Sequence, residues 1–182
     1  YRAGSVSSAR AGVRRAPLLD EPSRTARDRS IHGIYSATLT PFDRDHRPDA
    51  GLAVSYYRSL LERGCNGLNI LGTTGEAMSV AVYDRLRFMD AIASNLPRDR
   101  LMVGTGATAF HDAVELTKAA FSLGFAAALV LPPFYYREVT DDGLLRFFGD
   151  LIERTKPPDG GLFLYNFPRM SGITFHAGFV AR

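Results

Sequence analysis

Strand-like and helix-like segments alternate along this chain from residue 31 onward. Five short apolar segments have strand character, at 34–39, 67–71, 101–104, 127–131 and 162–165. Amphipathic helical patterns occupy the stretches between them, at about 52–60, 80–93, 110–123 and 141–151. This alternation predicts βαβ units around a parallel sheet, and therefore an α/β fold.

The repeat length of these units indicates which α/β fold to expect. The first and fifth strands begin at residues 34 and 162, so the mean period is about 32 residues. Eight such units need about 256 residues, the usual size of a (β/α)₈ TIM barrel. We therefore expect a TIM barrel of which this chain holds about the first five strands, with the sixth expected near residue 194, beyond Arg182.

Charge divides the chain into two parts, 1–30 and 31–182. The first 30 residues hold seven Arg against three acidic residues, whereas the remainder is close to neutral. We expect residues 1–30 to be a basic, disordered extension and residues 31–182 to form one barrel domain. An Arg-, Ala- and Ser-rich start also fits an organellar transit peptide, although a cytoplasmic location is the expectation.

Composition and spacing argue against several classes of function. A single cysteine, Cys65, rules out an intrachain disulfide and fits a reducing compartment. Residues 31–182 carry no basic stripe with interleaved aromatics, so we expect no nucleic-acid partner. The longest apolar run, 125–131, is too short to span a membrane. The histidines and aspartates lack metal-ligand spacing, and no nucleotide or other cofactor motif is complete.

Three strand candidates are followed directly by stretches rich in Thr or Tyr, namely Gly72–Glu76, Pro132–Tyr136 and Tyr165–Pro168. In parallel α/β folds the carboxyl ends of the strands form the functional face, so the three stretches predict one shared pocket. Thr73 and Thr74 lie between two glycines, where their hydroxyls and the local backbone N–H groups can converge on a carboxylate.

Each stretch alone also has a purely structural explanation. A Gly-Thr-Thr-Gly loop can be a plain turn between a strand and a helix. Tyr165 can pack with a hydrogen-bonded hydroxyl instead of transferring protons in a closed site. Tyr135 and Tyr136 follow two rigid prolines and can form an aromatic interface patch. The shared position of all three stretches, at strand ends on one face, favours function.

The motifs taken together resemble one family, the dihydrodipicolinate synthase/N-acetylneuraminate lyase family of class I aldolases. Their order, spacing and strand positions agree with that family over residues 31–182. The residues that carry the resemblance are Ala37–Phe42, Gly72–Glu76, Gly104–Gly106, Pro133–Tyr136, Tyr165–Pro168 and Gly172.

The resemblance implies a barrel whose strand-six lysine forms a Schiff base with pyruvate or a related 2-keto acid. By position, Thr74 would bind the keto-acid carboxylate together with its loop neighbours Thr73 and Gly75. Thr73, Tyr135 and Tyr165 would form a proton relay, with Tyr165 as the main acid and base. The family places the residue at Tyr135 in the neighbouring subunit's site, which implies a homo-oligomer, a dimer or tetramer. No cofactor or metal is implied.

Two departures from the family pattern limit what can be carried over. Dihydrodipicolinate synthases proper have Arg at the position of Met170, whereas the arginine here, Arg169, is displaced by one residue. This difference favours a sugar-acid or other 2-keto-acid lyase. The only lysines are Lys118, within a helical pattern, and Lys156, at a helix end. Neither suits an inward-facing strand position, so the 182-residue chain is expected to be inactive.

Two alternatives to catalysis remain open from the sequence. The chain can be a non-catalytic truncated homologue that acts only as a partner of full-length subunits. It can also be a carboxylate-binding module, which needs only Thr73, Thr74 and their loop.

Overall fold

The computed structural model describes residues 31–136 and 138–182. The extension expected at residues 1–30 lies outside this range. The described chain alternates strands and helices, as expected, and then adds two short helices. The elements are β1 (Tyr35–Ala37), α1 (Ala50–Glu62), β2 (Gly67–Ile70), α2 (Val82–Asn95), β3 (Leu101–Gly104), α3 (Phe110–Ser122), β4 (Ala127–Val130), α4 (Asp141–Thr155), β5 (Leu162–Leu164), α5 (Pro168–Ser171) and α6 (Ala177–Val180).

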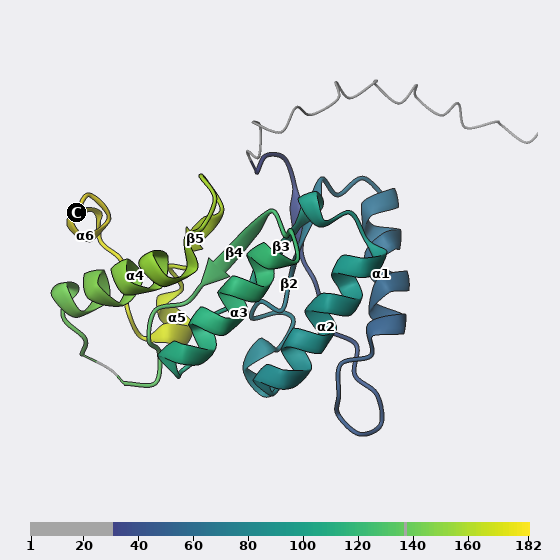
Figure 1. Ribbon diagram of the computed structural model, residues 1–182, viewed down its shortest axis with the longest axis horizontal. Coiled ribbons are helices and arrows are strands. Elements are labelled where there is room, and N and C mark those ends of the chain that lie inside the picture. The colour runs from purple at the N-terminus through teal and green to yellow at the C-terminus, as the bar shows by residue number, and fades with distance from the viewer. Residues whose placement is uncertain (1–30, 137) are drawn as a thin grey trace, which may run out of the picture.

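The five strands form one parallel sheet in the order β1-β2-β3-β4-β5. Each long helix therefore connects two neighbouring parallel strands. Figure 1 shows α1, α2, α3 and α4 side by side in chain order along one face of the sheet. This arrangement confirms the predicted α/β fold and corresponds to the N-terminal part of a TIM barrel.

Side-chain caps explain where two of the long helices begin. The Asp49 carboxylate accepts the backbone N–H of Leu52 at 2.9 Å and caps α1. The predicted cap Thr140 accepts the N–H of Gly143 at 3.2 Å, so α4 begins at Asp141 as expected. Such caps satisfy backbone donors that have no partner inside the helix.

Alternation along the strands separates two faces of the sheet. Leu68, Ile70 and Val103 are completely buried and belong to the core between the sheet and the helices. Residues of the opposite parity, among them Gly104 and Leu129, line a cavity on the other side. Because successive side chains point to opposite faces of a strand, one face stabilises the fold and the other is available to a ligand.

Tyr57 ties helix α1 to the end of β1. Its side chain is fully buried, and its hydroxyl donates a hydrogen bond to the Leu39 carbonyl at 2.9 Å. Burial disfavours the phenolate and raises the pKa of Tyr57 to about 12. The edge strand β1 is thus anchored by a neutral phenol inside the core.

Several boundaries differ from the predicted ones. Leu71, expected to extend the second strand, has a left-handed φ of 50° and ends β2 one residue early. A 3-10 turn at Ala77–Ser79 delays the start of α2 to Val82. The helices α5 and α6, four residues each, had no strong periodic signal because they are shorter than one hydrophobic repeat.

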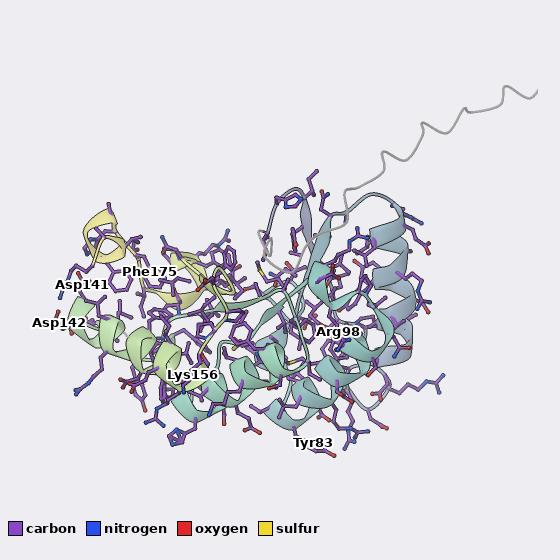
Figure 2. The ribbon with its side chains drawn as sticks, turned by 45° about the horizontal axis from the view of Figure 1, so that its top comes forward. Tyr83, Arg98, Asp141, Asp142, Lys156 and Phe175 are labelled. Atoms are coloured by element: carbon purple, nitrogen blue, oxygen red, sulfur yellow. The ribbon has the colours of Figure 1, made fainter. Side chains whose placement is uncertain are left out.

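The segment after β5 folds back onto α4. The Asn166 side chain donates to the Phe175 carbonyl at 3.2 Å and accepts the Phe175 N–H at 3.0 Å. His176 lies 3.0 Å from the Asp141 carboxylate, and Arg182 pairs with Asp142. Figure 2 shows Phe175, Asp141 and Asp142 at this end of the molecule.

No helix within 31–136 and 138–182 is both long enough and apolar enough to cross a membrane.

Candidate active site

A cavity of about 340 Å³ opens at the carboxyl ends of β2, β3, β4 and β5. Its size suits a small metabolite, because ligand pockets of proteins begin near 300 Å³. Most of its wall is apolar, and the polar side chains come from the loop after β2 and from the end of β5. The lining residues are Leu71, Gly72, Thr73, Glu76, Ala77, Met78, Ser79, Gly104, Gly106, Leu129, Leu131, Phe134, Tyr165 and Met170.

The loop after β2 is fixed in an unusual conformation. Leu71 and Glu76, which bracket it, both have left-handed φ angles, 50° and 52°. Side chains other than glycine rarely adopt this region, and residues that do so cluster at functional sites. The Thr40 hydroxyl donates to the Gly75 carbonyl at 2.7 Å in a buried hydrogen bond. The loop that carries Thr73 therefore turns sharply at both ends, and the hydrogen bond from Thr40 fixes it near Gly75.

Thr73 and Tyr165 meet in this cavity although 92 residues separate them. The two hydroxyl oxygens lie 3.5 Å apart, at the outer limit of a hydrogen bond. The Tyr165 ring also stacks on Phe167, with centroids 5.4 Å apart. Catalytic hydrogen bonds are often long without substrate, so this distance suits a relay that tightens around a ligand.

Thr74 lies on the outer part of the same loop, whereas Gly75 is buried. The Thr74 side chain is exposed and is not part of the cavity lining. The backbone N–H groups of Thr73, Thr74 and Gly75 make no hydrogen bond with any described residue. Consecutive N–H groups without partners in a turn can bind an anion such as a carboxylate. The backbone, more than the Thr74 hydroxyl, is thus prepared for an anionic group.

Tyr135 lies apart from the cavity. Its side chain is 72% exposed, and its ring packs edge-on against Tyr136 at a centroid distance of 5.1 Å. The structure therefore brings Thr73 and Tyr165 together but leaves Tyr135, the third relay residue predicted, on the surface of the single chain.

The two lysines also lie away from the cavity. Lys118 is exposed on α3, and Lys156 is exposed at the end of α4 in a left-handed conformation. Figure 2 labels Lys156. Neither is part of the cavity lining. This agrees with the expectation that neither lysine occupies an inward-facing strand position.

The wall at Met170 is apolar. Met170 on α5 lines the cavity, whereas its neighbour Arg169 is exposed and does not. Among the lining residues, Glu76 is the single charged side chain, and no cation is present. The displacement of the arginine by one residue therefore moves its charge off this wall.

Sequence reasoning missed Arg85, a buried arginine behind the cavity. Its guanidinium donates to the carbonyls of Gly104 and Gly106, both of which line the cavity. Burial disfavours the cation and lowers the pKa of Arg85 to about 10, so it remains charged at neutral pH. A signal was present, because Arg85 lies on the apolar stripe of α2 with Phe88 and Met89.

Comparisons with known proteins identify the family of this chain. Residues 30–182 match the model of the Dihydrodipicolinate synthetase family. A DapA-like lyase of Chloroflexus aurantiacus is 38% identical over 78% of this chain and 47% of its own length. The 4-hydroxy-tetrahydrodipicolinate synthase of Synechococcus sp. strain CC9605 is 34% identical over 82% of this chain and 49% of its own length.

Solved structures share the fold. Dihydrodipicolinate synthase of Agrobacterium tumefaciens matches with a TM-score of 0.77 and 27% identity, over 82% of this chain and 53% of that one. YagE of E. coli, in complex with pyruvate, matches with a TM-score of 0.75 and 26% identity, over 81% and 49%. The chain thus spans about half the length of the relatives it matches. Because the family model matches residues 30–182, this chain belongs to the dihydrodipicolinate synthetase family.

Proposed function

We propose that this chain is part of a Schiff-base lyase or aldolase that acts on pyruvate or a related 2-keto acid. The observation that carries the proposal is the approach of the Thr73 and Tyr165 hydroxyls to 3.5 Å within one cavity. Two hydroxyls from separate strand ends form a path along which a proton can move between a tyrosine and a bound substrate. A family member, YagE, has been solved with pyruvate, which supports the choice of substrate.

The keto-acid carboxylate is proposed to bind the loop after β2. The N–H groups of Thr73, Thr74 and Gly75 have no partner among the described residues and can donate to its oxygens. The Thr74 hydroxyl adds a further donor after a change of rotamer. This places the keto carbon toward Tyr165, where the chemistry takes place.

The nucleophile is proposed to be a lysine on a sixth strand that follows Arg182 in a longer chain. Its neutral amine attacks the C2 carbonyl of the keto acid, and loss of water gives the Schiff base. Tyr165 transfers protons to and from the reacting oxygen and carbon, and Thr73 connects Tyr165 to the substrate side of the loop. Tyr135 completes the relay only when a second subunit brings it to the site, so a homo-oligomer is part of the proposal.

The second substrate is proposed to lack a carboxylate at the Met170 wall. Met170 lines the cavity, and none of the described lining residues is a cation that could pair with a carboxylate at this wall. A second substrate that places hydroxyls or an apolar group at this wall fits better, so that the compound made or cleaved is a sugar acid or another 2-keto acid.

We propose that the protein acts in the cytoplasm.

Pyruvate binding to the 182-residue chain tests the loop directly. Saturation-transfer NMR should detect binding, and Thr74→Val should weaken it by about tenfold, because one donor to a charged group is lost. Thr174→Val, at an exposed position far along the chain, is the matched control and should leave the affinity unchanged. Equal affinity of the parent chain and Thr74→Val for pyruvate would show that the Thr74 hydroxyl does not bind the carboxylate.

Borohydride trapping separates catalysis from binding. With pyruvate, the 182-residue chain should give no covalent adduct, because Lys118 and Lys156 are exposed and neither lines the cavity. A longer chain that includes the sixth strand should give one adduct, located by peptide mass spectrometry on a strand lysine. An adduct on Lys118 or Lys156 would contradict the proposed nucleophile.

The free N–H groups of the loop also support a second candidate, a carboxylate-binding module without catalysis. A longer chain that binds pyruvate but cannot be trapped by borohydride would favour it, or a non-catalytic partner of full-length subunits.

A further inference from the structure

We propose that Arg85 is a positioning residue, which fixes the end of β3 at the cavity and, through the packing of Gly104 against Leu71, keeps Thr73 beside Tyr165. The proposal concerns the shape of the cavity and rests on the proposed function only where it extends to substrate affinity.

The contacts of Arg85 are directed at the cavity wall. Its side chain comes from α2 and is 2% exposed. Nη1 donates to the Gly106 carbonyl at 3.0 Å, and Nη2 donates to the Gly104 carbonyl at 2.8 Å. Both glycines line the cavity at the end of β3. One planar guanidinium therefore fixes two carbonyls on either side of Thr105.

The burial of Arg85 is not compensated by a salt bridge to a described residue. Within the described residues no carboxylate lies at salt-bridge distance from it, and Asp112 contributes only attraction at longer range. A buried cation is costly, and its compensation here is the pair of hydrogen bonds to carbonyls. A lysine ammonium has no planar two-pronged donor, so it cannot reproduce this geometry.

The end of β3 is in direct contact with the end of β2. A Cβ added at Gly104 would lie 2.1 Å from the Leu71 carbonyl oxygen, so the two backbones leave no room for a side chain. Leu71 itself is in the left-handed region and leads directly into Gly72 and Thr73. A shift of Gly104 is therefore passed to the loop that carries Thr73, and from there to the contact with Tyr165.

Fluorine NMR on the 182-residue chain tests this coupling without any substrate. The protein is labelled with 3-fluorotyrosine, and the Tyr165 signal is assigned by its loss in Tyr165→Phe. Arg85→Lys keeps the charge but loses the two-pronged donor, and Arg85→Met loses both. We expect the Tyr165 signal to shift or broaden in both variants. In Arg85→Ala, added ethylguanidinium should restore it, and an equal concentration of sodium ion should not.

Arg87 supplies the matched control. It lies on the same helix, is exposed, and packs over the Tyr83 ring at 5.6 Å. Arg87→Lys and Arg87→Met should leave the Tyr165 signal in place. A Tyr165 signal unchanged in folded Arg85→Lys would overturn the proposal. If neither Arg85→Lys nor Arg85→Ala with ethylguanidinium folds, Arg85 is a residue of general stability and the proposal is overturned as well.

A second readout links the position of the loop to pyruvate. Arg85→Lys should bind pyruvate about tenfold more weakly than the parent chain, whereas Arg87→Lys should bind equally. Equal affinity in folded Arg85→Lys would overturn the extension to substrate. Failure of the parent chain to bind pyruvate would instead contradict the proposed function and leave the fluorine result to decide the role of Arg85.

Discussion

The centre of the sheet and its β5 edge are built from the same kind of unit but are constrained very differently. Strands β2, β3 and β4 have two strand neighbours each and are almost wholly buried. Among the described residues, strand β5 has one strand neighbour, and Phe163 and Leu164 are 37% and 39% exposed. The candidate site draws one hydroxyl from each region. How well the distance between the Thr73 and Tyr165 hydroxyls is fixed therefore depends mainly on β5, the strand with fewer neighbours.

The largest expected effect comes from a core deletion in the centre. Leu68→Ala, at a fully buried position of β2, should lower the free energy of unfolding by about 2–5 kcal/mol, because it leaves a cavity in the core. Phe163→Ala on β5 should cost less than about 2 kcal/mol, since its ring is already partly in water. Urea unfolding of both variants measures the difference. Equal losses would show that the edge is as constrained as the centre.

A second prediction uses pH to probe the anchor of the other edge strand, β1. The pKa of Tyr57 is about 12 in the folded chain, against 10 for an ordinary tyrosine. The folded state thus keeps a proton that the unfolded state loses, so stability is full below pH 10 and falls as pH rises toward 12. A shift of this size corresponds to about 2–3 kcal/mol.

Substitution isolates this contribution. In Tyr57→Phe, the free energy of unfolding measured with denaturant should fall less steeply between pH 9 and 12 than in the parent chain. The exposed Tyr83 provides the control, because the free energy of unfolding of Tyr83→Phe should change with pH as in the parent chain. A parent-like slope in Tyr57→Phe would mean that another group causes the loss.

A third prediction compares Thr40, which holds the loop after β2, with Thr73, which the loop carries. Thr40→Val leaves the buried Gly75 carbonyl without its donor and should cost about 1–3 kcal/mol of stability. Thr73→Val removes only a long contact of 3.5 Å and should cost less than about 0.5 kcal/mol while it weakens ligand binding. Thermal unfolding and pyruvate titration of the two variants check this. Reversed stability effects would mean that Thr73, not Thr40, holds the loop.

The smallest effect is expected on the edge side, at Gly149 of α4. A Cβ at this position meets no atom within 4 Å, so Gly149→Ala should raise stability by about 0.5–1 kcal/mol through helix propensity alone. Gly104→Ala, with the Leu71 carbonyl oxygen at 2.1 Å, is the opposing case and should destabilise the chain. Chemical denaturation of both should give opposite signs. A lower free energy of unfolding in Gly149→Ala would mean that another group packs against the face of α4 that carries Gly149.

Much of the architecture could be predicted from the sequence because its signals are local and repeated. Apolar runs followed by amphipathic stretches gave the order of strands and helices, and Thr140 marked the start of α4. The meeting of Thr73 and Tyr165 followed from a rule of parallel sheets, that strand ends share an edge. These conclusions needed no knowledge of individual contacts.

The remaining features depend on distant contacts that no local pattern records. Leu71 has ordinary strand character, yet the turn toward Thr73 gives it a left-handed φ. The position of Arg85 on the apolar stripe of α2 indicates burial, but its two carbonyl partners at and after the end of β3 cannot be read from the sequence. The exposed position of Thr74 depends on the rotation of a single turn, which the spacing of residues does not determine.

The paired hydrogen bonds between Asn166 and Phe175 have a mechanical consequence. One side-chain amide both donates to and accepts from the same backbone residue, so it acts as a clasp that closes the loop from 166 to 175. A pulling force applied at the C-terminus would act on these two hydrogen bonds before it acted on β5. Hydrolysis of that amide to a carboxylate would keep the acceptor but set a negative charge against the Phe175 carbonyl, and the clasp would open without a break in the chain.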